Sequence, residues 1–108
     1  MFIEAWNKKA TEVHETAKAK GWWSTERNDG EIIALMHSEL SEALEALRNG
    51  NGPDDHIPEF NGTEAEMADV VIRIMDYGKA RGLRIAEAIE AKMAFNTKRS
   101  FKHGGKAF

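Results

Sequence analysis

The sequence contains no cysteine among its 108 residues. This absence excludes disulfide bonds, thiolate metal sites and cysteine nucleophiles. Long apolar runs are missing as well, because none approaches the ~18 consecutive residues that a membrane span requires. Charged residues interrupt the apolar residues of the N-terminus, so we expect no signal peptide. The sequence predicts a cytoplasmic protein that does not associate with membranes.

Basic residues are too few for a general nucleic-acid-binding protein. The chain has 15 Lys and Arg against 18 Asp and Glu, which gives a formal net charge of -3 at pH 7. We therefore expect no nucleic-acid partner. Acidic residues are absent after Glu90, where five basic residues follow, namely Lys92, Lys98, Arg99, Lys102 and Lys106. This asymmetry suggests an anionic ligand held partly through a cation, and a solvated basic tail is an equally good interpretation.

Proline is scarce, and both prolines fall in residues 49–62 together with three glycines, which predicts a loop. Elsewhere apolar residues recur at steps of three and four, and no stretch alternates convincingly as a strand. The prediction is an all-α chain forming one domain over residues 1–108. Its four helices are expected to run from about Ile3 to near Gly21, over about 30–48, over about 63–79 and over about 85–98.

Local signals predict where these helices begin and end. Asn28 or Asp29 is expected to cap the second helix. Thr63 and Glu66 have the spacing of a capping box that opens the third helix. Gly78 and Gly82 are expected to mark the fraying end of that helix.

Two helices place acidic residues on faces that should be buried. A helical projection at ~100° per residue puts Glu39 inside the apolar sector of the second helix and Glu42 at its edge. On the third helix, the acids form a narrow polar strip on an otherwise apolar surface, whereas a surface helix normally has a broad polar face. The strip consists of Glu66, Asp69, Arg73 and Asp76.

These inward carboxylates need compensating positive charge, because burying an unpaired carboxylate costs several kcal/mol. Arg73 can pair with one or two of them, so a divalent cation is the simplest solution. Oxygen ligands without His or Cys favour Mg²⁺ or Mn²⁺. Other interpretations remain open residue by residue: Glu66 as part of the capping box, Glu42 paired with a lysine in solvent, and Asp76 paired with Arg73.

The acid pattern resembles a known family. Glu39-x-x-Glu42 followed by Glu66-x-x-Asp69 is similar to the ExxE…ExxD signature of the MazG-like, all-α nucleoside triphosphate pyrophosphatases. The downstream Lys92-x-x-x-Asn96-x-x-Arg99 and the segments "GWW", "RNDGE", "HSELSEALEALR" and "AEMADVVIRIMD" resemble the small single-domain proteins of this family. The resemblance covers about residues 20–106.

The resemblance implies a four-helix MazG-like bundle that forms homodimers or homotetramers through its helices, with the acid pairs on two long central helices. It implies Mg²⁺-dependent hydrolysis of a nucleoside triphosphate to the monophosphate and pyrophosphate, with Mn²⁺ as a substitute. The implied metal ligands are Glu39, Glu42, Glu66 and Asp69. Either Glu39 or Glu42 is the expected general base.

The resemblance also implies residues that contact the nucleotide. Lys92 and Asn96 are expected to bind the triphosphate, with Arg99, Lys102 and Lys106 as weaker candidates that reach their own site or a neighbour's. Trp22 or Trp23 is expected to stack on the base, and the alternative is that both only cover the core. Asn28 either reads a base edge or caps its helix.

Three other functions compete with this prediction. A phosphoribosyl-ATP pyrophosphatase shares the acid-rich helical site. A non-catalytic helical dimerisation module would bind metal only for structure. A ferritin-like di-iron protein is disfavoured, because neither acid pair has a His three residues on.

Overall fold

The computed structural model describes residues 1–99 of the chain, and these form four helices and no strand. The helices are α1 (Phe2–Ala19), α2 (Asp29–Arg48), α3 (Gly62–Arg81) and α4 (Ile85–Asn96). The all-α prediction is confirmed, with helix ends that differ from the predicted ones by about two residues. No helix in this part of the chain combines the length and the apolar character needed to cross a membrane.

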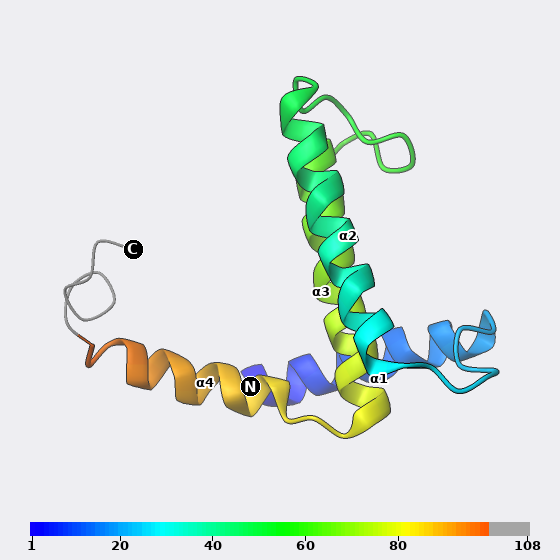
Figure 1. Cartoon of the computed structure of the whole chain (residues 1–108). Helices are drawn as coiled ribbons and strands as arrows, with labels where there is room; N and C mark the ends of the chain where they lie inside the picture. Colours follow the sequence, from blue (N-terminus) through cyan, green and yellow to red (C-terminus); the bar gives the residue numbers. More distant parts are fainter. Residues whose placement is uncertain (100–108) are drawn as a thin grey trace.

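The helices form a hairpin with two further helices across its foot (Figure 1). α2 and α3 run side by side as the upright pair, and α1 packs against α3 at one end of it. α4 packs against α1 and extends away from the upright pair. A closed four-helix bundle is therefore not confirmed for the single chain.

The start of α3 differs from the prediction in a way that matters for the site. Asn61 is the N-cap, its Oδ1 accepts a hydrogen bond from the Glu64 backbone N–H at 2.8 Å, and Glu64 completes the capping box. The predicted box of Thr63 and Glu66 is therefore wrong. The Thr63 N–H and hydroxyl instead donate to Asn51 Oδ1 in the preceding loop, at 2.9 and 2.7 Å. As a result, the Glu66 side chain is free for another role.

The other end of α3 also differs from its prediction. Gly78 is buried inside the helix, where a Cβ would lie 3.0 Å from Ile85 Cγ1, so it marks close packing and not a fraying end. Gly82 ends the helix as predicted, with a left-handed φ of 66° that favours glycine. The turn that follows leads directly into α4.

Small residues bring the helices together. The buried apolar residues among those described are Ala10, Ile32, Ala43, Ala65 and Ala86, and no large side chain is wholly buried. At Gly62, a Cβ would lie 2.8 Å from Ala46 Cβ, so the start of α3 lies directly against α2. This close packing brings the acidic faces of α2 and α3 together, and it leaves many large apolar side chains half exposed.

Candidate metal centre

Glu39 is the one charged residue in residues 1–99 that is buried, with 9% of its surface exposed. It lies in the middle of α2, on the face that also buries Ile32 and Ala43. The prediction that this glutamate interrupts the apolar face is confirmed. A carboxylate in such a position needs hydrogen bonds or a positive charge close by.

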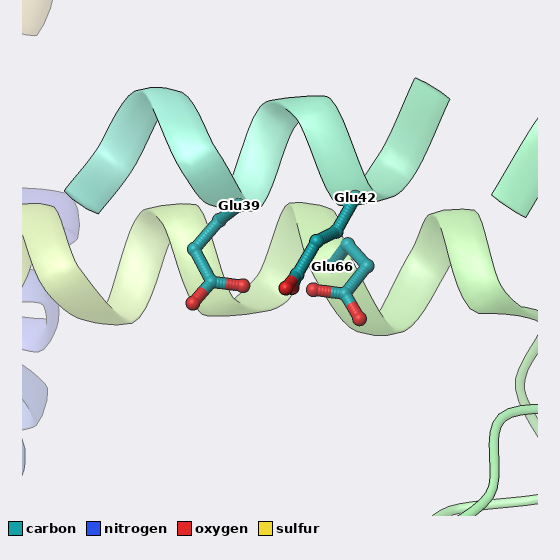
Figure 2. Close-up of side chains that lie close together, drawn as sticks. All are labelled: Glu39, Glu42 and Glu66. Carbon is teal, nitrogen blue, oxygen red and sulfur yellow. The ribbon is translucent and has the colours of Figure 1, made fainter. Parts of the chain in front are cut away.

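Three carboxylates from two helices meet at this position. Glu39 and Glu42 project from α2 toward Glu66 of α3 (Figure 2). Each offers an oxygen, and the three oxygens lie within 4.8 Å of one another. Oxygens no more than 4.8 Å apart can share one cation, since opposite ligands of an octahedral Mg²⁺ site with 2.0–2.1 Å bonds lie ~4 Å apart. The donor set, all oxygen and anionic, fits Mg²⁺ or Mn²⁺.

The electrostatics of the three acids are asymmetric. Burial, hydrogen bonding with Glu39 and Glu42 and the negative charge of these two residues together raise the pKa of Glu66 to about 8. Burial opposes ionisation of Glu39 as well, but hydrogen bonds from Glu66 and Arg73 and the Arg73 charge outweigh it and lower the pKa of Glu39. Glu66 thus keeps a proton at neutral pH in the metal-free protein, while Glu39 is ionised.

Glu66 also has an unsatisfied oxygen. Its Oε2 is buried and has no hydrogen-bond partner in the described part of the chain. A buried polar atom without a partner costs about 1–3 kcal/mol, so native proteins keep few of them. A bound cation would satisfy this oxygen and remove the proton at the same time.

Arg73 supplies the nearest positive charge. Its Nε and Nη2 both donate to Glu39 Oε1, at 3.1 and 2.9 Å. The predicted pairing of Arg73 with one of the acids is thereby confirmed. One guanidinium cannot neutralise the negative charge of these carboxylates, because Asp69 adds a further one beside the three glutamates, one turn after Glu66.

Asp69 lies beside the group and is not part of it. Burial and the negative charge of Glu39 raise its pKa, and Arg73 opposes this shift. Asp69 and Glu39 both line a cavity of about 250 Å³ between α1, α3 and the connector before α2. Asp69 is therefore placed to contact either a metal ion or a ligand in that cavity.

The cavity beside the acids has an aromatic side and an apolar side. Trp22, which is 54% exposed, lines it together with Arg27, and Val13, Ala17 and Ile72 supply apolar surface. Neither Arg27 nor Lys20, which also lines the cavity, was predicted from the sequence. The only available signal for Arg27 was its position five residues after Trp22, and the structure places its guanidinium 5.8 Å from that ring.

Trp23 and Asp76 have structural partners. The Trp23 indole N–H donates to both Asp76 oxygens at 2.9 and 3.0 Å, and His14 Nδ1 lies 2.7 Å from Asp76 Oδ1. The interpretation that Asp76 pairs with Arg73 is therefore wrong. Asn28 caps α2 by accepting from the Glu31 N–H at 3.1 Å, as one of its two interpretations stated. Of the three base-binding candidates, Trp22 is the one that lines the cavity beside the acids.

The predicted phosphate ligands lie elsewhere in the single chain. Lys92 and Asn96 are on α4, Arg99 follows it, and all three side chains are exposed. None of them lines the cavity beside the acids. Lys102 and Lys106 fall outside the described residues. The structure brings Glu39, Glu42 and Glu66 together and places Asp69 and Trp22 in the adjoining cavity, but it does not bring the α4 residues to them.

The raised pKa of Glu66 predicts how stability depends on pH. Its folded pKa of about 8 lies above the ordinary value of 4.5, so the folded protein holds an extra proton between these values. Without metal, the melting temperature should therefore fall as pH rises through this window, and the raised pKa of Asp69 acts in the same direction.

Calorimetry in EDTA at several pH values between about 5 and 8 measures this slope. Glu66→Gln is the matched variant and should flatten it. A wild-type melting temperature that rises across the window, or an unchanged slope in Glu66→Gln, would contradict the assignment.

Comparison of the chain with protein-family models, with curated proteins and with solved structures finds no match in any of the three. The resemblance to MazG-like proteins therefore stays a prediction from the sequence.

Proposed function

We propose that the chain is a metal-dependent hydrolase that converts a nucleoside triphosphate to the monophosphate and pyrophosphate. Glu39, Glu42 and Glu66 would hold Mg²⁺ or Mn²⁺, with Asp69 beside them. The observation that carries the proposal is the convergence of three carboxylates within 4.8 Å, in which Glu66 has a buried oxygen without a partner. The ExxE…ExxD pattern supplies the reaction class.

Residues of the chain would have separate roles around the bound cation. The cation, when bound, polarises a phosphate oxygen and neutralises charge that develops during cleavage. Either Glu39 or Glu42 would accept the proton of the attacking water. Glu39 is ionised, as both a base and a metal ligand must be, and its lowered pKa favours metal binding over proton transfer. Arg73 holds the Glu39 carboxylate in place through two hydrogen bonds to one oxygen.

The cavity beside the acids would take the nucleoside. Its aromatic and apolar lining suits a planar base, and its position next to Glu39 and Asp69 would put the phosphates at the metal. Triphosphate contacts from Lys92, Asn96 and Arg99 require α4 of a second copy or a different position of α4, because in one chain this helix packs on α1.

Trp22→Ala should raise KM for the nucleotide about 5- to 150-fold, since stacking of a base on an aromatic ring contributes ~1–3 kcal/mol. Steady-state kinetics with the best nucleotide measures the change. Trp22→Phe, which keeps an aromatic face, should recover most of the affinity. If the alanine and phenylalanine variants both match the wild type, Trp22 is not a base platform.

A panel of ribo- and deoxyribonucleoside triphosphates with Mg²⁺, together with phosphoribosyl-ATP, tests the proposed activity. Pyrophosphate release from at least one of them, abolished by EDTA, is the expected result. Metal-dependent stabilisation without hydrolysis of any member would favour the structural metal-binding module instead.

A further inference from the structure

An arginine without an acidic partner lines the cavity beside the acids. Arg27 is partly buried there, in the connector between α1 and α2. The arginines that form ion pairs within residues 1–99 are Arg48, Arg73 and Arg81. Arg27 is not among them, so no carboxylate of the described chain is paired with its charge. That charge is available to a ligand in the cavity.

Contacts with neighbouring residues hold Arg27 in place. Its guanidinium carbon lies 4.8 Å from the centre of the Trp23 ring and 5.8 Å from that of Trp22. Arg81 Nη2 donates to the Arg27 carbonyl oxygen at 2.9 Å, and Arg81 Nε donates to Asp29 at 2.8 Å. These contacts involve the faces of two rings and the backbone of Arg27, and they leave its guanidinium N–H groups free to donate. A donor group fixed in advance loses little freedom when a ligand binds.

Arg27 lies toward the end of the cavity that is farther from the metal ligands. The ring of Trp23 beside it donates to Asp76. Asp76 follows Asp69 by seven residues on α3, which is about 10 Å along the helix at 1.5 Å per residue. Asp69 and Glu39 line the same cavity next to the metal ligands. Phosphates bound at the metal would therefore place the base of the nucleotide near Arg27.

The polar side chains around the base position offer mainly hydrogen-bond donors. A guanidinium carries five N–H donors and no acceptor, and the ammonium of Lys20, which also lines the cavity, carries donors alone. The Asp76 oxygens are already occupied, because both accept from Trp23 and one lies 2.7 Å from His14 Nδ1. The Thr16 hydroxyl can donate or accept and does not discriminate. A base edge that presents acceptors is therefore favoured here.

Of the two purines, guanine meets this requirement. It presents O6 and N7 as adjacent acceptors, and a single arginine can donate to both. Adenine has an amino group in place of O6, which would set a donor against the guanidinium donors. The loss of one good hydrogen bond and the burial of an unpaired donor both disfavour adenine.

We propose that Arg27 is a specificity-determining residue that contacts the edge of the base and makes the cavity selective for guanine over adenine. This inference rests on the proposed function, because it requires that the cavity receives the base of a nucleotide whose phosphates lie at the metal.

Nucleotides that cannot be cleaved test this inference separately from hydrolysis. The α,β-methylene analogues of GTP and ATP keep the base and the phosphate chain but cannot release pyrophosphate. In calorimetric titrations with Mg²⁺, the GTP analogue should bind to the wild type ~5- to 150-fold more tightly than the ATP analogue, the discrimination that one bidentate contact provides. Equal affinities, tighter binding of the ATP analogue, or binding of neither at millimolar concentration would overturn the inference.

Substitutions of Arg27 assign the preference to this side chain. Arg27→Gln should abolish the preference for guanine and favour adenine, because a glutamine amide pairs with N6 and N7 of adenine. Arg27→Lys keeps a cationic donor that can contact O6 and N7, so it should keep a preference for guanine. Arg48→Gln, the same change at an arginine paired with Glu45 on α2, is the control and should alter neither affinity. An Arg27→Gln protein that binds both analogues more weakly by the same factor would show that Arg27 contacts phosphate, and would overturn the inference.

Failure of this inference can be distinguished from failure of the proposed function. Guanine-selective binding that depends on Arg27, without hydrolysis of any natural nucleoside triphosphate, would support selection of the base and contradict the hydrolase. Pyrophosphate release with the same ratio of kcat/KM for GTP and ATP in wild type and Arg27→Gln would support the hydrolase and overturn the selection of the base by Arg27.

Discussion

Replacing Glu39 with glutamine is expected to reduce pyrophosphate release by ~10²–10⁴-fold, the range that loss of a general base produces. Glu39 is the buried acid of the group, it is ionised because its pKa is lowered, and its oxygens lie against those of Glu42 and Glu66. Glutamine keeps the shape of the side chain but can neither accept the proton nor balance a cation. The comparison is between the turnover numbers of folded wild-type and variant protein.

The same substitution should have little effect on folding. Arg73 loses its ionised partner, which is unfavourable, but Asp69 loses a negatively charged neighbour, which is favourable. Because these effects oppose each other, the free energy of unfolding without metal should change by no more than ~1 kcal/mol. Glu45→Gln, on the exposed face of α2, should alter neither property. A Glu39→Gln protein that is unstable yet fully active would show that Glu39 is a structural ion-pair partner.

Magnesium or manganese is expected to raise the melting temperature by ~10 °C or more at concentrations well above the dissociation constant. Binding at a hundredfold excess over that constant stabilises a folded protein by ~2.7 kcal/mol, and each kcal/mol corresponds to ~4–8 °C for a chain of this size. Thermal unfolding across a metal titration measures this shift. Calcium, which prefers more ligands at longer distances, should give a smaller one.

Protons should compete with the metal. Glu66 has a pKa of about 8 without metal and must lose its proton to become a ligand. The shift should therefore increase as pH rises toward 8 and should be accompanied by proton release in weakly buffered solution. Glu66→Gln should remove most of it. A melting temperature that does not respond to millimolar metal at any pH would contradict the metal centre.

The sequence predicted the helices and the buried position of Glu39 for a clear reason. The spacing of apolar residues along a helix shows which face is buried. A glutamate within that face, such as Glu39, can therefore be identified from the sequence alone. The position of Asp69 on the narrow polar strip was visible in the same way. Both depend only on the helical period and not on how the helices meet.

The ends and partners of the helices were harder to predict. Thr63 and Glu66 have the spacing of a capping box, but Asn61 and Glu64 offer the same chemistry two residues earlier, and Asn51 then holds Thr63. Trp23 and Asp76 are 53 residues apart, so their hydrogen bonds follow from the packing of the connector on α3. Local sequence patterns carry no information on such contacts.

The position of α4 could not be predicted from local sequence patterns either. Its apolar residues predict a helix, but its packing on α1 separates Lys92 and Asn96 from the acids within one chain. Which helix α4 packs against depends on contacts between residues that are far apart in the sequence, and the residues of α4 do not record those contacts.

The most direct test of the central claim is phosphorus NMR of the products formed from a nucleoside triphosphate by wild-type protein with Mg²⁺, beside a Glu39→Gln sample of equal concentration. We expect equal amounts of nucleoside monophosphate and pyrophosphate from the wild type and neither above background from the variant. Inorganic phosphate with a nucleoside diphosphate, or pyrophosphate at the same rate from both proteins, would contradict the account.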